Sequence, residues 1–268
     1  MSAAKKEWEL GIGEGELVRL TKGMQEAHLE TLPALHEGAA ELVEEIGRGH
    51  AGRRRFLAGA GIAAAAAAFA LTSGTGSGKA FGAPGAPGRA AGPGRAAAPS
   101  PYQGDVKVVA LAAALENQAV GAYGAALKAA GAGKLGKVPP AVGTFAKTAM
   151  EQHAAHSKAW NAVLTGAGRP AITGVPLSNQ PATLKALGRA KDVGAVARLA
   201  LALEDQAAQT YLFAVGHVSS PAGVRTAASI APVEAMHAAI LHFVLGEYPV
   251  PDAFLQTDRA AKPALLTV

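Results

Sequence analysis

The 268-residue chain has no cysteine and few charged or aromatic residues. Without cysteine it cannot form disulfides, thiolate metal sites, cysteine-linked haem or a lipid-modified cysteine. Charged residues make up 17% of the chain and aromatic residues 5%. From residue 100 onward, 14 Lys and Arg residues against 10 Asp and Glu residues leave a net charge of +4, without a basic stripe or interleaved aromatic residues. This pattern argues against nucleic-acid binding.

Glycine and proline, in contrast, are abundant, and their distribution divides the chain into four zones. Residues 1–50 are polar and predict partial helix, with interruptions expected at Gly23 and Pro33. Residues 51–71 hold a basic cluster and a weakly apolar run. Residues 72–101 contain mostly Gly, Pro, Ala and Ser, which predicts a disordered, flexible linker. Residues 102–268 are the predicted folded domain.

Residues 51–71 have the layout of an export signal. Residues 53–57 read RRRFL and resemble the twin-arginine signal, and the AFA at 68–70 offers a cleavage site. The apolar run 56–71 is shorter than the roughly 20 residues that span a bilayer. The resemblance implies passage through the twin-arginine export machinery to the periplasm, cell envelope or exterior, with membrane contact only through this segment. The alternative is an uncleaved membrane anchor.

The predicted folded domain is all-α. Proline in a first turn, a Ser-Ser cap signal and long apolar runs place four helices. They are expected at 105–130, 140–165, 192–218 and 221–246. The connection between the second and third helices is much longer than the others and contains three prolines, with room for a short helix at 182–189. Two helical hairpins joined by one long crossover form one known class of four-helix bundle.

One sequence motif, the Leu-Glu-x-Gln-Ala phrase, occurs twice in the domain, 88 residues apart. Residues 115–126 read LENQAVGAYGAA, and residues 203–214 read LEDQAAQTYLFA. Each copy places one carboxylate, Glu116 or Glu204, among alanine and leucine. A buried carboxylate is costly unless it is paired, so the two copies suggest a shared partner. The alternative, two exposed surface charges, is disfavoured by the apolar neighbours.

The helices that follow each copy also repeat, at a shift of 81 residues. His156 then aligns with His237, and Glu234 stands three residues before His237. Residues three apart share a helix face, so a Glu-x-x-His pair can converge on one ion. Di-metal carboxylate bundles take one Glu from each of two helices and a Glu-x-x-His pair from each of the others.

On these motifs the chain resembles the ferritin-like superfamily, and more narrowly the bacterial twin-arginine-exported ferritin-like domain proteins, over about residues 105–250. The resemblance implies an antiparallel four-helix bundle of two helical-hairpin repeats with one long crossover. It also implies a core metal centre holding iron, as a di-iron or single-metal site, with manganese or zinc compatible. Fe(II) oxidation by oxygen or peroxide would follow. The candidate ligands are Glu116, His153, His156, Glu204, Glu234 and His237.

Position 153 departs from the family pattern, which has Glu three residues before His156. His153 stands there instead. Glu151 is no substitute, because it lies about 200° around the helix from His153. Three glutamates and three histidines form a less anionic site than four glutamates and two histidines. Such a site suits one divalent ion, or an asymmetric pair, better than two trivalent ions.

Several alternatives stay open. The histidines could be hydrogen-bonded core residues. The repeated tyrosines, Tyr123 and Tyr211, could donate to the carboxylates, but ordinary core tyrosines are the favoured interpretation. We expect inter-helix or surface contacts for Gln118 and Gln206, and a structural or exposed position for two further histidines, His217 and His242.

The main functional alternative is a non-catalytic structural or binding domain at the cell envelope that has lost a complete di-metal site. The sequence identifies no catalytic residue and does not decide whether the protein is an enzyme. The oligomeric state is also open, with a homodimer among the options.

Overall fold

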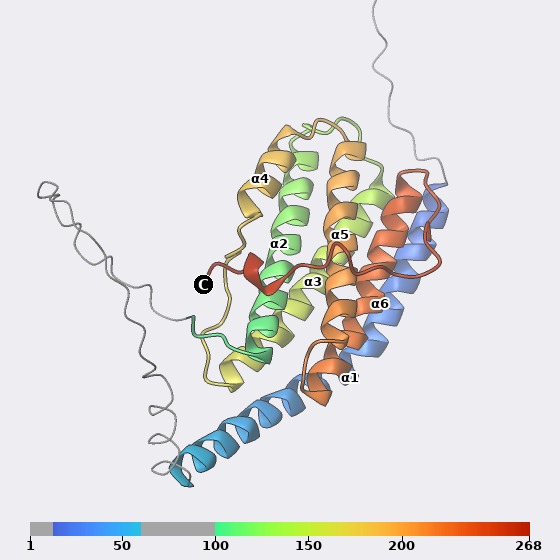
Figure 1. Ribbon diagram of the computed structural model, residues 1–268. Helices are drawn as coiled ribbons and strands as arrows, with labels where there is room; N and C mark the ends of the chain where they lie inside the picture. The colour runs from blue at the N-terminus through green and yellow to red at the C-terminus, as the bar shows by residue number, and fades with distance from the viewer. Residues whose placement is uncertain (1–12, 60–99) are drawn as a thin grey trace, which may run out of the picture. The chain divides into compact units, whose positions relative to one another are not determined.

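The computed structural model describes residues 13–59 and 100–268, and the regular structure of these residues is helical (Figure 1). The all-α prediction is therefore confirmed for the described residues, where the one β feature is an isolated bridge between Leu177 and Leu266. Most of the predicted export segment and almost all of the predicted linker lie outside the described residues. The helices are α1 (Glu14–Gly59), α2 (Asp105–Gly131), α3 (Pro140–Gly166), α4 (Gln180–Arg189), α5 (Val193–Val215), α6 (Pro221–Val244) and the short 3-10 helix η1 (Pro263–Leu265).

The four predicted helices correspond to α2, α3, α5 and α6, and α4 occupies the long connection. Asp192 begins α5 by accepting a hydrogen bond from the backbone N–H of Ala195, and Ser220 begins α6 in the same way with Gly223. α5 and α6 end two to three residues earlier than expected. For α6 the reason is local, because Gly246 adopts a φ of 75° that ends the helix.

The core helices associate as two pairs. α2 packs along α3, and α5 packs along α6, while α2–α5 and α3–α6 contacts join the pairs (Figure 1). The pairs match the two repeats in the sequence, since each pair contains one copy of the Leu-Glu-x-Gln-Ala phrase. α4 contacts α2 and α5 from the connection between the pairs.

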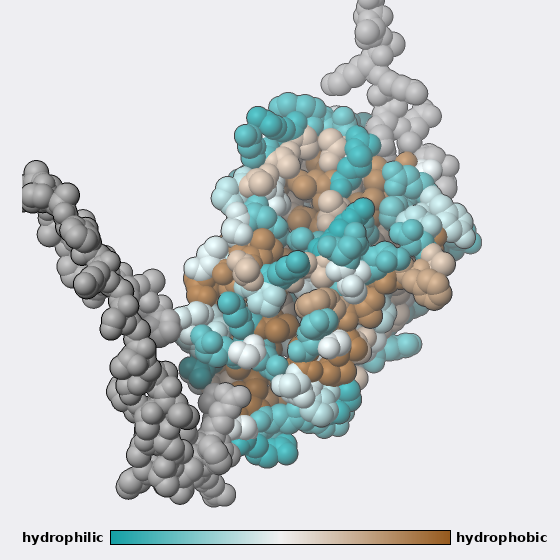
Figure 2. Space-filling model, viewed as in Figure 1, coloured by the Kyte–Doolittle hydropathy of each residue, from teal (hydrophilic) through white to brown (hydrophobic). Residues whose placement is uncertain are grey.

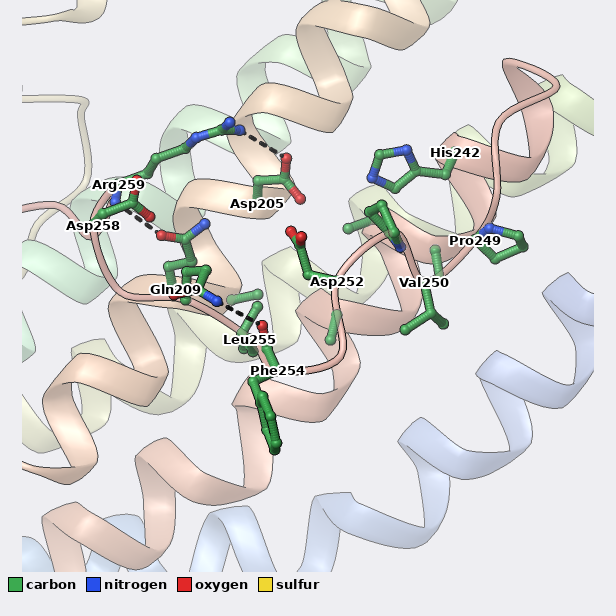
Figure 3. Close-up of a pocket in the computed structure, with 16 residues that line it drawn as sticks. Asp205, Gln209, His242, Pro249, Val250, Asp252, Phe254, Leu255, Asp258 and Arg259 are labelled. Carbon is green, nitrogen blue, oxygen red and sulfur yellow. Dashed lines mark hydrogen bonds and ion pairs between the residues drawn. The ribbon is translucent and has the colours of Figure 1, made fainter.

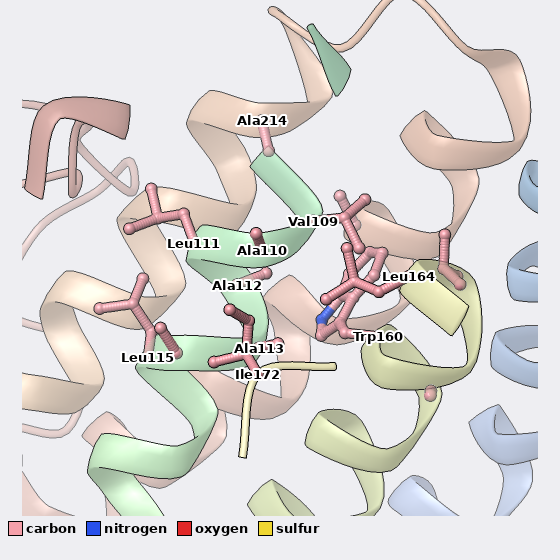
Figure 4. Packing of buried hydrophobic residues seen from close by; sticks show 14 of the residues in the cluster. Val109, Ala110, Leu111, Ala112, Ala113, Leu115, Trp160, Leu164, Ile172 and Ala214 are labelled. Carbon is pink, nitrogen blue, oxygen red and sulfur yellow. The ribbon is translucent and has the colours of Figure 1, made fainter. Parts of the chain in front are cut away.

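α2 is the most deeply buried of the core helices at its middle. Residues 109–116 are all buried, so this stretch has no solvent face. Its alanines let neighbours approach closely, and Trp160 and Leu164 of α3, Ala214 of α5 and Ile172 of the connection pack nearby (Figure 4). A helix buried all around must satisfy any polar side chain internally. Glu116 lies at the end of this stretch.

α1 runs without a break through Gly23 and Pro33, where we expected interruptions. A proline inside a helix costs about 3 kcal/mol, so another contribution must offset it. Leu17, Met24 and Leu42 lie at helical spacing and are almost completely buried in the two hydrophobic clusters of the domain. Packing on the domain therefore stabilises α1 over the residues up to Ile46.

Residues 47–100 form a separate unit from residues 1–46 and 101–268. Of this second unit the structure describes the last turns of α1, through Gly59, and Ser100. The arginines of the predicted signal, at 53–55, are therefore helical.

Polar contacts also hold α1 to the beginning of α6. Glu41 forms an ion pair with Arg225, and Glu45 accepts a hydrogen bond from the Ser220 hydroxyl. Gly38 of α1 lies so close to α6 that a β-carbon added there would be 2.5 Å from the Thr226 hydroxyl oxygen.

This contact predicts opposite effects for two glycine substitutions in α1. Gly38→Ala should lower the free energy of unfolding by about 1–3 kcal/mol, because buried Thr226 leaves no room for the methyl group. Gly23→Ala should raise it by about 0.5–1 kcal/mol, because that position has open space around it and alanine favours the helix. Chemical denaturation of the full chain measures both. Equal effects would contradict the packing of α1 on α6.

Candidate metal centre

All six candidate ligands come together in the interior. Each is at most 2% exposed, and the four core helices contribute them from their buried faces. α2 provides Glu116, α3 provides His153 and His156, α5 provides Glu204, and α6 provides Glu234 and His237. We refer to these six residues as the Glu/His cluster.

The Glu/His cluster contains two overlapping groups of four residues. Glu116 and His156 complete one group, and Glu204 and His237 complete the other. His153 and Glu234 belong to both. Within each group one possible ligand atom per residue lies within 4.8 Å of all the others, so each group could hold a metal ion.

His153, which departs from the family pattern, lies at the centre of the cluster. Its Nδ1 is 2.7 Å from a carboxylate oxygen of Glu116, and its Nε2 is 3.0 Å from one of Glu204. The imidazole thus links the two repeated glutamates through both ring nitrogens. A glutamate side chain at this position could not make the same link without placing three carboxylates together.

Two atoms of the cluster form an ion pair but make no hydrogen bond. The Nδ1 of His156 and the Oε1 of Glu234 are 2.9 Å apart, and neither makes a hydrogen bond of good geometry with any described residue. A buried polar atom that lacks a hydrogen bond costs about 1–3 kcal/mol, and the attraction between these two atoms offsets only part of that cost. A cation bound by both atoms would remove that cost. The cluster as built therefore fits a metal ion, and its carboxylate and imidazole donors suit iron, manganese or zinc.

The surroundings oppose loss of protons from the histidines. Burial by itself would lower the pKa of His153, but the carboxylates of Glu204 and Glu234 and the hydrogen bonds to Glu116 and Glu204 raise it well above its usual value. The pKa of His156 is raised to about 9 against the same effect of burial, chiefly by Glu116. Neutral imidazole is the form that binds metals, so a metal ion must displace these protons.

The glutamates respond in the opposite direction. Burial would raise the pKa of Glu116, but His156 and His153 lower it to about 2. The pKa of Glu204 is also held well below its usual value, against burial, by His153 and His237. Both carboxylates are therefore ionised over the physiological pH range.

The two repeated tyrosines are not ordinary core tyrosines, and that favoured interpretation was wrong. The hydroxyl of Tyr123 donates to Glu204 at 2.5 Å, and the hydroxyl of Tyr211 donates to Glu116. Each tyrosine thus donates a hydrogen bond to the glutamate of the other repeat. The reason is that α2 and α5 face one another across the core. The tyrosine seven residues after the glutamate of one helix therefore lies beside the glutamate of the other helix.

This crossed pairing predicts different costs for the two tyrosine-to-phenylalanine substitutions. Tyr123→Phe removes one hydrogen bond to a carboxylate, which we expect to cost about 1–3 kcal/mol. Tyr211→Phe should cost more, because its hydroxyl also accepts a hydrogen bond from Trp160 at 2.8 Å. Thermal denaturation measures the difference, with Tyr248→Phe as the control because Tyr248 is 75% exposed. A larger loss in Tyr123→Phe would contradict the geometry.

The remaining expectations about polar residues agree with the structure. Gln118 makes inter-helix hydrogen bonds to α4 and the residue before it, and Gln206 contacts the backbone of Arg259. His217 is exposed and stacks on Phe213, while His242 pairs with Glu247. Glu151 faces away from the cluster and pairs with Lys147.

The sequence did not reveal three residues next to the cluster. Gln152 is buried, and its amide oxygen accepts a hydrogen bond from the Nε2 of His237 at 2.7 Å. Its amide nitrogen donates to Gln25 of α1, also at 2.7 Å. His28 of α1 is 2% exposed, and its ring centroid is 5.1 Å from that of His156. Helical periodicity could not place α1 beside the cluster, so no local signal identified these contacts.

Outside the cluster, the surface has a pocket of about 500 Å³ between α5, α6 and the segment that follows α6 (Figure 3). Asp205, Asp252 and Arg259 line it together with the apolar side chains of Val250 and Leu255. No member of the Glu/His cluster lines it. The exterior shown in Figure 2 mixes hydrophilic and hydrophobic residues in small areas and has no broad apolar face on that side.

Among the described residues, α6 has the length and apolar character of a membrane span, with a mean hydropathy of 1.4 over its most apolar window. Of that window 56% is buried inside the domain. α6 also carries Glu234 and His237, which are completely buried. These features are typical of a core helix in a folded domain.

The fold and the cluster define a class of protein, a helical domain with a candidate metal centre of carboxylates and imidazoles between its helices. The family described as "Ferritin-like domain" matches residues 104–247, which is 144 of the 268 residues. The chain therefore belongs to the ferritin-like domain family. Comparisons with curated proteins and with solved structures gave no match. α1 and the residues after 247 lie outside the family match.

Proposed function

We propose that the protein binds a metal ion in the Glu/His cluster, with iron the first candidate and manganese or zinc compatible. The observation that carries this proposal is the pair of buried atoms on His156 and Glu234, which lie 2.9 Å apart and make no hydrogen bond. Membership of the ferritin-like family and the two overlapping groups of possible ligands support it. The topology that goes with it is a ferritin-like bundle of α2, α3, α5 and α6, with α4 in the crossover.

The residues divide into separate and shared roles. Glu116 and His156 would hold an ion on one side, and Glu204 and His237 would hold one on the other. His153 and Glu234 are available to either. Bound iron would supply one-electron redox chemistry with oxygen or peroxide. The chain itself supplies the ionised carboxylates, keeps solvent out by burying all six residues, and orients two of the carboxylates with Tyr123 and Tyr211.

A second candidate function has one observation in its favour. His153 hydrogen-bonds to Glu116 and Glu204 at once, and such a link could hold the helices together without a metal. The domain would then be a structural or binding module that uses the cluster as a buried polar network. Under this alternative, metal ions should neither bind nor stabilise the protein.

Metal titration of the purified full chain separates the two candidates. We expect a stoichiometric complex with Fe(II), Mn(II) or Zn(II), detected by elemental analysis after gel filtration, together with a rise in melting temperature. At a free metal concentration 100 times the Kd, the stabilisation should be about 2.7 kcal/mol. A protein without bound metal and without a thermal shift for any of the three ions would exclude the metal-binding proposal.

We also propose export through the twin-arginine pathway, supported by the RRRFL sequence at 53–57. Residues 14–46 contact the domain, so the chain before cleavage has α1 packed on it. Cleavage at the predicted site would remove α1, and the exported form should then begin after Ala70. Intact mass measurement of the protein in each cell fraction tests this, with Arg53→Lys and Arg54→Lys together as the blocked variant. A full-length chain confined to the cytoplasm would contradict export.

A further inference from the structure

α1 brings polar side chains to the Glu/His cluster from outside the family match. Gln25 and His28 both lie on the face of α1 that is turned toward α3. His28 is buried edge-on against His156, at an interplanar angle of 64°. α1 therefore reaches two of the three candidate histidine ligands. His28 contacts His156 directly, and Gln25 reaches His237 through Gln152.

A chain of two hydrogen bonds connects α1 to His237. The Nε2 of His237 donates to the amide oxygen of Gln152, and the amide nitrogen of Gln152 donates to the amide oxygen of Gln25. The amide nitrogen of Gln152 donates to the amide oxygen of Gln25, and in this arrangement the amide oxygen of Gln152 faces His237. That oxygen can only accept, so it favours a proton on the Nε2 of His237.

The position of that proton decides which nitrogen can bind a metal. The Nδ1 of His237 is within hydrogen-bond distance of Glu204 at 3.3 Å and Glu234 at 3.2 Å, inside the second group of possible ligands. A metal ion bound by these carboxylates would take the place of a proton on Nδ1, and the remaining proton would stay on Nε2, where Gln152 accepts it. If the amide of Gln152 were reversed, its nitrogen would face Nε2, and the proton would move to Nδ1 and block it.

We propose that, in the uncleaved chain, Gln25 of α1 is a positioning residue of the metal centre, which acts through Gln152 to keep His237 as an Nδ1 ligand. The inference rests on the proposed metal binding and extends it to a helix that the family match does not include. Partners that fix a ligating histidine typically change metal affinity about 10–100-fold when they are altered. Gln25 is one residue further from His237 than Gln152 is. Loss of its acceptor should therefore weaken metal binding less than its replacement by a donor, which would reverse the amide of Gln152.

Three substitutions at position 25 separate the direction of the hydrogen bond from packing. Gln25→Glu keeps an acceptor for Gln152 and should leave Co(II) affinity within about 2-fold of wild type. Gln25→Met removes the acceptor at similar size and should weaken binding about 3–10-fold. Gln25→Lys offers only donors, reverses the amide of Gln152, and should weaken binding about 10–100-fold. Glu30→Gln, on the exposed face of α1, is the matched control.

The measurement is a Co(II) titration of the full chain followed by visible absorption, which reports both affinity and ligand geometry. Circular dichroism of each variant confirms that the helices remain. Nitrogen NMR of the Zn(II)-loaded protein should show the His237 proton on Nε2 in wild type and Gln25→Glu. Equal Co(II) spectra and affinities in all position-25 variants would overturn the inference while leaving metal binding intact. No Co(II) or Zn(II) binding by wild type would overturn both.

Discussion

Glu234→Gln should abolish metal binding on both sides of the cluster, whereas Glu116→Gln and Glu204→Gln should each impair one side. The reason is that Glu234 belongs to both groups of possible ligands, and each of the other glutamates belongs to one. Glutamine keeps the size of the side chain and removes its charge. We expect a loss of affinity of more than about 100-fold in Glu234→Gln, since altering residues one step behind a ligand already costs about 10–100-fold.

Metal stoichiometry after equilibrium dialysis against Mn(II) distinguishes these variants. If two ions bind, Glu116→Gln and Glu204→Gln should each retain one, and Glu234→Gln should retain none. Glu151→Gln is the control, because Glu151 lies on α3 near His153 but is exposed. The shared role of Glu234 would be refuted if its variant bound as much Mn(II) as the Glu151 variant.

Sequence patterns predicted the core helices and the candidate ligands because both depend on local features. Apolar runs, caps and prolines mark the ends of α2, α3, α5 and α6 within a few residues. The repeated glutamates stand out because burial of an unpaired carboxylate in an Ala- and Leu-rich helix costs much free energy. In the structure the glutamates and histidines lie together, in agreement with the expectation that the two repeated glutamates share one partner.

The features that escaped prediction depend on which helices meet. Tyr123 pairs with Glu204 and not with Glu116, because α2 and α5 face each other in the core. The spacing of residues along one helix cannot predict this pairing. Gln152 precedes His153 by one residue, and its contact with Gln25 exists only because α1 packs on the domain. Pro33 predicted a break that tertiary packing of α1 overrides.

His153→Glu, which restores the usual pattern of the family, should make the stability of the protein depend on metal. In the present chain His153 links Glu116 and Glu204 by hydrogen bonds from both ring nitrogens. A fourth glutamate would replace that link with repulsion among buried carboxylates. Removing one partner of a buried charge pair costs about 3–5 kcal/mol. For a domain of this size the metal-free melting temperature should fall by roughly 10 °C.

Added metal should reverse the loss of stability, because the charge of two divalent ions is balanced by four carboxylates. The three carboxylates of the wild-type cluster leave part of that charge unbalanced. We therefore expect the variant to gain more thermal stability from Mn(II) or Fe(II) than wild type does, and to bind two ions. His153→Gln removes the imidazole without adding charge and should lose stability without gaining metal dependence. His36→Glu adds the same charge at an exposed position of α1 and should change neither property. If metal-free His153→Glu melts with wild type, the carboxylates cannot lie as close as the Glu/His cluster places them, and the imidazole at 153 is not what holds them together.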